Sequence, residues 1–397
     1  MRIALLTYST KPRGGVVHTL NLAEALADLG ESVTVITLGR GGDRGFFRPV
    51  NESVGVVVLA FSEVVGEGVG ERILRSIDTM ASGFPSGNFD VVHAQDCISA
   101  NAVPGSIRTV HHLDTFATPQ LVRCHNNGIL RPSHHVCVSE AVAEQLRLRW
   151  GISATVIPNG VEQARFAQAA SDHPDHVAAR ERWAKRLGGP YVVTVGGIEP
   201  RKGSLDLASA FGLARSYGLD PDIRLAIAGG ETLFDYRSYR EAFDRHCQAL
   251  GVAPIILGPV PHPEMASLVA GATAFMFPSL MEGFGLAPLE AAAAGVPVVA
   301  RDIAVLKAVL GKGARFATDP ESMARALLEA TREPDFDMLA AGRAAASRFS
   351  WEATAQAHLE LYNQVLAERP VAAHPCQQAP REACWHTREN HPMPAEQ

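Results

Sequence analysis

The feature that most constrains the fold is an alternation of short apolar segments with helical ones, which runs through the chain twice. In the first half the expected strands are Ile3–Leu6, Ser32–Leu38, Val54–Ala60, Asp90–His93, Arg108–His111, His135–Ser139 and Ala154–Ile157. In the second half they are Tyr191–Val195, Arg224–Ala228, Ile255–Leu257, Thr273–Phe277 and Val296–Ala300. Fully apolar strands separated by helices are typical of a parallel sheet covered by helices on both faces. We therefore expect an α/β chain of two doubly wound, Rossmann-like domains.

The length of 397 residues suits two such domains with additional ends, since one domain commonly takes about 100–200 residues. We expect the first domain at residues 1–165 and the second at 166–349, with a linker and a first helix in the polar stretch 162–189. Two helices follow Pro334, and the composition of 369–397 predicts a disordered tail. Ligands of doubly wound sheets bind beyond the carboxyl ends of the strands, so we expect the site in a cleft between the domains.

Charge and hydropathy exclude several classes of protein. With 36 basic and 42 acidic residues the formal net charge is −6, so no overall basic field would recruit nucleic acid. The uncharged run 265–281 contains Gly271 and Pro278 and reads as a helix, turn and strand rather than a membrane span. The apolar start MRIALLT is too short for a signal peptide. We expect a cytoplasmic protein with at most peripheral membrane contact and no nucleic-acid partner.

Cysteine and histidine patterns indicate neither a disulfide framework nor a metal centre. The six cysteines are scattered and form no CxxC pair, which does not match the spacing of a disulfide scaffold or a zinc site. Cys376 and Cys384 share the tail with His374, His386 and His391, but the spacing is irregular. We therefore predict no metal ligands in this sequence.

The segment from Glu282 to Glu290, with the sequence EGFGLAPLE, is the most informative stretch. Gly283 and Gly285 allow a tight loop whose backbone is accessible, and Pro288 suits the first turn of a helix. The free N–H groups at the start of that helix favour a phosphate. Carboxylates at these two positions could accept hydrogen bonds from sugar hydroxyls and from a ribose diol. The alternative is a capped helix with two solvated glutamates.

A second candidate site follows the strand 191–195, where two glycines lead to Arg201 and Lys202 just before a helix. Cations at a helix start are unfavourable against the helix dipole unless an anion binds there. Arginine binds phosphate through two hydrogen bonds and lysine through its point charge. We therefore expect Arg201 and Lys202 to hold a diphosphate, the alternative being two exposed cations.

Three further candidates belong to the first domain. Gly14 and Gly15 precede the first helix and would let a phosphate or sugar approach the backbone, although the pattern is not the GxGxxG of dinucleotide sites. His111 ends a strand and could donate to a sugar hydroxyl, or it could be a structural histidine. The segment 40–48 mixes cations with aromatic residues and could contact an anionic acceptor or a lipid headgroup, although a solvated loop is the preferred interpretation.

Together these residues resemble the retaining glycosyltransferases of family 4, which have the GT-B fold. The resemblance covers about residues 1–368 and rests on Glu282 and Glu290, on Arg201-Lys202-Gly, on Gly14-Gly15, on Thr-Val-His111 and on Val156-Ile-Pro-Asn-Gly-Val161. It implies a sugar transfer from a nucleoside-diphosphate sugar with retention at the anomeric carbon and no obligatory metal. It also implies that the first domain faces the acceptor and that the helix at 350–368 crosses back onto it.

The resemblance implies roles for individual residues. Glu290 would bind the donor ribose, Glu282 and His111 the donor sugar, and the amides of Phe284, Gly285 and Leu286 the sugar and phosphate. Arg201 and Lys202 would hold the diphosphate, and Gly15 would let the backbone approach the donor sugar. Many members of the family carry an arginine directly after the strand-ending glycine, whereas this chain has Gly196-Gly197-Ile198. Arg201 is the candidate for the missing charge.

Two other functions remain open from the sequence. A nucleotide-sugar epimerase of the same architecture would need no acceptor, and a non-catalytic protein would only bind the nucleotide sugar. The intact pair Glu282 and Glu290, together with His111, favours the transferase. The acceptor itself, whether a small molecule, a glycan or a lipid headgroup, is not identified by any of these residues.

Overall fold

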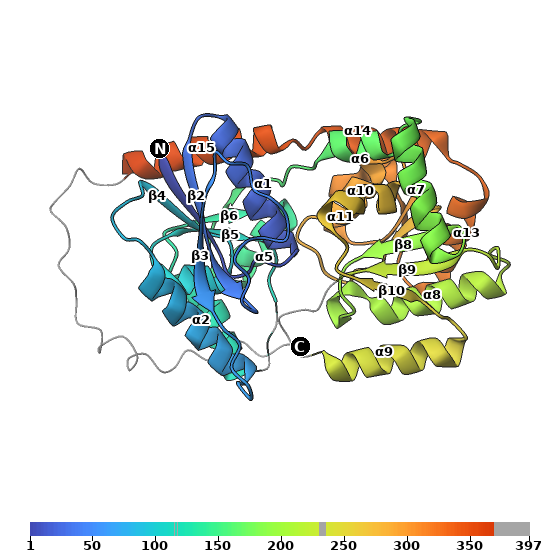
Figure 1. Cartoon of the computed structure of the whole chain (residues 1–397), viewed down its shortest axis with the longest axis horizontal. Helices are drawn as coiled ribbons and strands as arrows, with labels where there is room; N and C mark the ends of the chain where they lie inside the picture. The colour runs from blue at the N-terminus through green and yellow to red at the C-terminus, as the bar shows by residue number, and fades with distance from the viewer. Residues whose placement is uncertain (115, 117, 230–235, 369–397) are drawn as a thin grey trace.

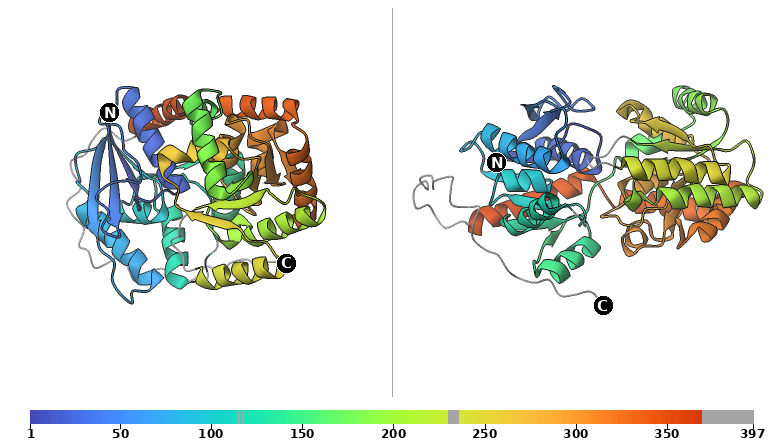
Figure 2. Two further views of the ribbon diagram at one scale, coloured as in Figure 1. Left: turned by 45° about the vertical axis from the view of Figure 1, so that its right-hand side comes forward. Right: turned by 90° about the horizontal axis from the view of Figure 1, so that it is seen from below.

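The computed structural model describes residues 1–368 apart from 115, 117 and 230–235. Two α/β domains stand side by side and are joined along one edge (Figures 1 and 2). This architecture confirms the two doubly wound domains predicted from the alternation of strands and helices. The predicted tail at 369–397, with its cysteines and histidines, lies outside the described residues.

The first domain contains a parallel sheet with the strand order β3-β2-β1-β4-β5-β6-β7. Its strands are β1 (Arg2–Thr7), β2 (Ser32–Arg40), β3 (Gly55–Phe61), β4 (Val91–Ala94), β5 (Ile107–Val110), β6 (His134–Cys137) and β7 (Thr155–Val156). The helices are α1 (Gly14–Asp28), α2 (Val69–Gly83), α3 (Cys97–Ala102), α4 (Pro119–Leu130) and α5 (Glu140–Trp150). The strand order reverses between β1 and β4, which pair with Leu6 opposite Ala94.

The second domain repeats the arrangement with the strand order β10-β9-β8-β11-β12-β13. Its strands are β8 (Tyr191–Val195), β9 (Arg224–Ala228), β10 (Ile255–Gly258), β11 (Ala274–Phe277), β12 (Val298–Arg301) and β13 (Arg315–Ala317). Its helices are α6 (Gln163–Ala169), α7 (Pro174–Leu187), α8 (Ser204–Ser216), α9 (Arg237–Leu250), α10 (His262–Ala270), α11 (Leu286–Ala293), α12 (Ala304–Leu310), α13 (Pro320–Arg332) and α14 (Phe336–Ser347). Here the strand order reverses between β8 and β11.

Each sheet is buried on both faces, as its uninterrupted apolar strands require. In the first sheet, Ile3 and Leu5 face a core shared with α1, while Ala4 and Leu6 face the side covered by α2. In the second sheet one core includes residues of α6, α7 and α11, and the opposite core includes residues of α8, α9 and α13. Both sheets therefore leave only their strand ends for ligands.

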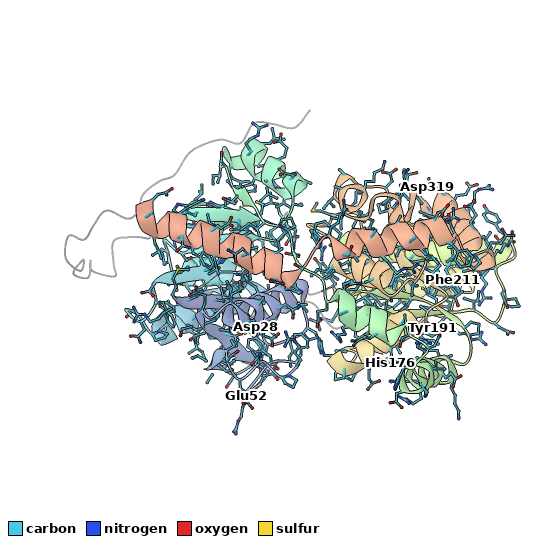
Figure 3. The ribbon with its side chains drawn as sticks, turned by 90° about the horizontal axis from the view of Figure 1, so that it is seen from above. Asp28, Glu52, His176, Tyr191, Phe211 and Asp319 are labelled. Carbon is cyan, nitrogen blue, oxygen red and sulfur yellow. The ribbon has the colours of Figure 1, made fainter. Side chains whose placement is uncertain are left out.

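The last described helix, α15 (Trp351–Glu368), returns to the first domain and packs against α1 (Figure 1). Ala355, Leu361, Tyr362 and Val365 on this helix are buried in the core that contains Ile3 and Leu5. Seen from above, α15 lies along the first domain while its neighbour α14 lies on the second (Figure 3). The predicted crossing helix is therefore present.

Two details differ from the sequence-based expectations. The stretch 162–189 holds two helices rather than one, because Pro174 starts a new helix after the end of α6. Since α6 packs against α10 and α11, the expected boundary at 165 falls inside an element that contacts the second domain. The strand β13 was not expected, because its three residues, two half-buried and one buried, are too few to give a pattern.

Candidate active site at the domain junction

The two loops that follow β8 and β11 form the centre of the site. Residues 200–202 make one 3₁₀ turn, and Gly203 then adopts φ 64° directly against the carbonyl of Pro278. A side chain at Gly203 would collide with that carbonyl, so this glycine permits the close approach of the two loops. The amide of Leu280 donates to the carbonyl of Arg201 over 2.8 Å. The switch point of the second sheet thus brings the two cations to the Glu282 loop.

Lys202, Arg201 and Glu282 meet as one charged cluster. Lys202 Nζ lies 2.6 Å from Glu282 Oε1, and an Arg201 guanidinium nitrogen lies 3.3 Å from the same oxygen. The Glu282 side chain is only 11% exposed. Although burial opposes it, the charges of Lys202 and Arg201 lower the pKa of Glu282. The carboxylate is therefore ionised at neutral pH and occupies the position where an anion would meet the two cations.

Two further carboxylates surround Arg201, one from each domain. Glu199 Oε1 lies 3.6 Å from an Arg201 nitrogen, and Asp114 extends from the loop after β5 of the first domain. Against the opposing effect of burial, Glu282, Glu199 and Asp114 raise the pKa of Arg201. His112 Nε2 lies 3.0 Å from Asp114. Asp114 and Glu199 were not predicted as site residues. Their only signal in the sequence is that they lie close to His111 and Arg201 in the chain.

The second glutamate of the pair lies on α11, whose N-terminus faces this cluster. Gly285 precedes the helix with φ 98°, in the region that favours glycine. Burial and the neighbouring Glu162 raise the pKa of Glu290 to about 8. Glu162 itself accepts a hydrogen bond from Arg165 over 2.9 Å. Glu290 is therefore half-buried one turn into α11 and holds its proton more strongly than Glu282, whose pKa is lowered by the two cations.

The amides expected to bind donor groups belong to the same helix start. The Phe284 side chain is 4% exposed and packs against Phe349, with ring centroids 5.2 Å apart. The Phe284 ring is therefore part of the packing of the second domain and is not free to contact a ligand. The first N–H groups of a helix have no intrahelical acceptors, so Gly285 and Leu286 provide an amide-lined positive end beside Glu282.

His111 contacts the second domain across the junction, and Gly15 lies beside it in the first domain. His111 directly follows β5, one residue beyond the observed strand end. A Cβ added at Gly15 would lie 3.4 Å from the His111 ring, and one added at Gly283 would overlap the His111 carbonyl oxygen. The two domains are thus in direct contact here, and residues predicted separately from both domains come together.

The His111 imidazole is neutral in this environment. Burial, together with His112 and Arg108, lowers the pKa of His111 to about 3. Its Nε2 is buried and has no hydrogen-bond partner among the described residues. A neutral imidazole can donate or accept one hydrogen bond at this atom, which suits a ligand hydroxyl rather than an ion pair.

The segment 40–48 is anchored at its two ends, whereas Gly41, Gly42, Arg44 and Gly45 between them are exposed, as expected for a solvated loop. Arg48 is 8% exposed and forms a bidentate ion pair with Glu24. Phe47 packs against His262 of the second domain, with ring centroids 5.9 Å apart. His262 Nε2 lies 2.7 Å from an Arg165 nitrogen. This contact across the junction, close to Glu162 and Glu290, was not predicted from the sequence.

Comparison with protein families gives matches in both domains. A model of the family "Glycosyltransferase Family 4" matches residues 12–165, and a model of "Glycosyl transferases group 1" matches residues 176–344. Phosphatidyl-myo-inositol mannosyltransferase of Mycolicibacterium smegmatis is 29% identical over 401 residues, which cover 92% of this chain and 94% of that protein. D-inositol 3-phosphate glycosyltransferase of Corynebacterium urealyticum is 26% identical over 427 residues, which cover 94% and 99%.

Comparison with solved structures shows the same two-domain fold. Sucrose-phosphate synthase from Thermosynechococcus elongatus superposes with a TM-score of 0.73 at 20% identity, covering 92% of this chain and 99% of that one. Anabaena HepE in complex with UDP-glucose gives a TM-score of 0.67 at 18% identity, covering 92% and 100%. Over residues 1–368, with the gaps stated above, no helix is both long and apolar enough to cross a bilayer.

Proposed function

The chain belongs to the group 1 glycosyltransferases of family 4 and has the GT-B fold, and from this premise we propose that its junction cluster binds the diphosphate of a nucleotide-sugar donor. As a glycosyltransferase it moves a sugar from such a donor to an acceptor. The observation that supports the location is the meeting of Lys202, Arg201 and Glu282 at the N-terminus of α11, opposite His111. We also propose that the transfer retains the anomeric configuration.

In the absence of donor, Glu282 occupies the place that the diphosphate would take beside the two cations. Two positive side chains held inside a protein need a counter-charge, and Glu282 supplies it at 2.6 Å from Lys202. A diphosphate carries more negative charge than one carboxylate and would displace Glu282 from the cations. The freed carboxylate then accepts hydrogen bonds from hydroxyl groups of the donor sugar. Binding of donor therefore exchanges one ion pair for another instead of burying new charge.

The two cations also act on the chemical step. Negative charge builds up on the diphosphate as the bond to the sugar breaks, and cations already in place stabilise that charge without reorganisation. Arg201 and Lys202 together provide two positive charges, and we propose that they make a metal ion dispensable for the leaving group. Activity measured in excess EDTA should then equal activity in added Mg²⁺, and dependence on the metal would contradict this part of the proposal.

His111 and Glu290 position the two ends of the donor. The neutral His111 offers Nε2 to a sugar hydroxyl, while Glu290, one turn into α11, accepts from the ribose diol. Both contacts persist from the ground state to the transition state, so they contribute to donor affinity more than to turnover. Phe284, Gly285 and Leu286 contribute their amides to the sugar and the phosphate, and Gly14 and Gly15 let the backbone approach.

The names of the relatives suggest the chemistry of the acceptor. Two of them are named for phosphatidyl-myo-inositol and for D-inositol 3-phosphate, both of which carry a phosphate group next to a polyol. We propose that this chain also uses a hydroxylated acceptor that approaches from the first domain. A cytoplasmic location with at most peripheral membrane contact remains our expectation.

The test begins with a thermal-shift screen of nucleoside diphosphates and their sugars, since a ligand that binds only the folded state raises the melting temperature. The best donor is then incubated in radiolabelled form with the full chain. Transfer or slow hydrolysis supports the proposal. An epimerised nucleotide sugar, or binding without turnover by a fully folded chain, would contradict it in favour of the two alternatives.

Glu290→Ala tests the ribose contact separately. We expect this variant to weaken donor binding about tenfold, since the side chain makes two hydrogen bonds to the diol and each neutral one contributes about 0.5–1.5 kcal/mol. Glu241→Ala is the matched control, because Glu241 is an exposed glutamate on α9 of the same domain. Unchanged donor affinity in Glu290→Ala would show that the ribose lies elsewhere.

A further inference from the structure

A cluster of arginines surrounds Tyr8 at the switch point of the first sheet, where no donor group has been placed. Tyr8 directly follows β1, Arg40 ends β2 and Arg13 precedes α1. Arg72 and Arg75 approach from α2. These residues therefore gather where β1 and β4 diverge, the position at which doubly wound sheets bind ligands.

The cluster is rigid because the arginines hold the aromatic rings between them. The guanidinium groups of Arg13 and Arg40 lie 5.5 and 5.1 Å from the centre of the Tyr8 ring. Arg13 donates to the Tyr8 hydroxyl over 2.6 Å, and Arg40 donates to the Tyr8 carbonyl over 3.1 Å and to Ser76 over 2.9 Å. The side chains are thus fixed before any ligand arrives, which lowers the entropy lost on binding.

Two carboxylates balance the positive charge of these four arginines only in part. Glu67 pairs with Arg75 at 2.6 Å and also acts electrostatically on Arg72 and Arg40, and the buried Asp96 acts on Arg40. Among residues 1–368 with the stated gaps, Arg13, Arg40 and Arg72 form no ion pair. The nearby Asp96 is occupied by the Tyr8 amide and by Ser99, each 2.9 Å away.

Burial makes the incomplete counter-charge costly. It lowers the pKa of Arg40, the nearby Arg13 and Arg72 add to that decrease, and Tyr8 and Asp96 oppose it. The buried Nε of Arg13 has no hydrogen-bond partner among the described residues. Arginine stays protonated even so, which means that repulsion among the guanidinium groups persists until an anion binds.

The backbone adds to this positive potential. The helix α1 is 15 residues long, starts at Gly14, and has neither a side-chain cap nor an acidic residue in its first turn. Its positive end therefore points at the same place as Arg13. Gly15, next in the chain, borders His111, so the cluster lies beside the donor-sugar site but on the first domain, apart from Arg201 and Lys202.

We propose that Arg13, Arg40, Arg72 and the start of α1 form a binding site for a phosphate group carried by the acceptor. This inference rests on the proposed function, since it assigns a chemical class to the acceptor of that reaction. A phosphate monoester carries about −1.5 to −2 charges and three acceptor oxygens, which matches several unpaired guanidinium groups better than a carboxylate does. The acceptor hydroxyl would then extend from this phosphate toward His111 and the donor sugar.

The experiment measures anion binding by the full chain saturated with the nucleoside diphosphate selected in the screen. Inorganic phosphate, D-inositol 3-phosphate and vesicles of phosphatidylcholine with phosphatidylinositol are the three probes, and myo-inositol is the uncharged control. Binding of the soluble monoester or of the vesicles distinguishes a free phosphate acceptor from a lipid headgroup. We expect at least one phosphate probe to bind at least tenfold more tightly than myo-inositol.

Arg13→Gln and Arg72→Gln should each weaken that binding about tenfold or more, because each removes a charge-assisted contact. The matched control is Arg44→Gln, because Arg44 is an exposed arginine in the loop that follows β2. This variant should bind like the parent chain. Arg13 and Arg72 are preferred to Arg40, whose bonds to Tyr8 and Ser76 also support the fold.

Three results would overturn the inference: no phosphate probe binds, binding survives both Arg13→Gln and Arg72→Gln, or the probe competes with the nucleoside diphosphate. The last would show that the anion occupies the donor site. Nucleotide binding is recorded separately in every sample. A chain that binds phosphate through Arg13 but binds no nucleotide would contradict the proposed function and leave the anion site supported.

Discussion

Lys202 and Arg201 were predictable as site residues from the sequence alone. Two cations at the start of a helix are unfavourable unless an anion binds there, and in the structure the Glu282 carboxylate lies against both of them. Glu199 had only its closeness to Arg201 in the chain as a signal, and Asp114 could not be predicted because it comes from the other domain. The role of Arg13 also depends on tertiary contacts, because its guanidinium and that of Arg40 meet at the Tyr8 ring.

Lys202→Ala should lower turnover at least about a hundredfold, because it removes one cation from the leaving diphosphate. Steady-state rates with labelled donor measure the effect. Lys307→Ala is the matched control, since Lys307 is an exposed lysine in the same domain that also pairs with a carboxylate, Asp302, at 2.9 Å. Full activity in Lys202→Ala would place the diphosphate elsewhere.

Glu290→Gln should make stability less dependent on pH. The pKa of Glu290 is raised to about 8 in the folded chain, from an ordinary value of 4.5. Between these values the folded state binds the proton and the unfolded state does not, so this group's contribution is fully present below about pH 4.5 and is lost as pH rises through about 8. The melting temperature of Glu290→Gln minus that of the parent should therefore increase from pH 5 to pH 8.

The control for this series is Glu241→Gln, which changes an exposed glutamate on α9. Its melting temperature should differ from that of the parent by the same amount at every pH. If the difference for Glu290→Gln is also constant with pH, the pKa of Glu290 is not raised in the folded chain.

At the scale of helices and strands, buried apolar runs were predictable and short or polar elements were not. Strands such as β1 and β8 are mostly apolar, β-branched and buried, so their residue types identify them. In contrast, β13 has three residues, and its first, Arg315, forms ion pairs with Glu329 and Asp335. That strand exists because β12 offers it an edge to pair with, which is tertiary information.

The helix α15 packs on the first domain through apolar side chains and through buried polar contacts, one of which can be tested by mutation. The Tyr362 hydroxyl lies 2.7 Å from Nδ1 of His93, and both side chains are fully buried. Tyr362→Phe leaves that nitrogen without a partner and should lower the free energy of unfolding by roughly 1–3 kcal/mol. Chemical denaturation of the full chain measures it.

Glu360→Ala on the same helix serves as the control, since Glu360 is exposed and such changes usually stay within about 0.5 kcal/mol. Equal stability of Tyr362→Phe and Glu360→Ala would mean that the contact between Tyr362 and His93 contributes nothing to holding α15 on the first domain.

At the scale of the whole molecule, two chain segments cross between the domains and are fastened to each other. The amide of Val161 donates to the carbonyl of Phe349 over 3.1 Å, and Thr354 Oγ1 donates to the carbonyl of Pro158 over 2.8 Å. Gly160 lies so close to the backbone of Trp351 that any side chain there would collide. These two crossings lie together at one edge and form the hinge. The domains can therefore open and close on the opposite side.

Gly283 controls how closely the domains meet at the active site, and this leads to a prediction for the whole molecule. Its backbone touches the His111 carbonyl and lies near Val138, both in the first domain. A methyl group in Gly283→Ala would overlap the carbonyl, so the domains must separate or the loop must shift. We expect separation, because the loop is fixed to Arg201 by the Leu280 amide and by the ion pairs of Glu282.

Small-angle scattering should then show a larger radius of gyration for Gly283→Ala than for the parent chain. Donor affinity should fall by an order of magnitude or more, because the diphosphate cations on one domain and His111 on the other no longer face the same ligand. Gly45→Ala is the control, since a side chain at Gly45 meets no atom within 4 Å. If Gly283→Ala keeps the parent's radius of gyration while losing affinity, the loop has shifted within its own domain, and closure of the domains is not what brings His111 to the donor.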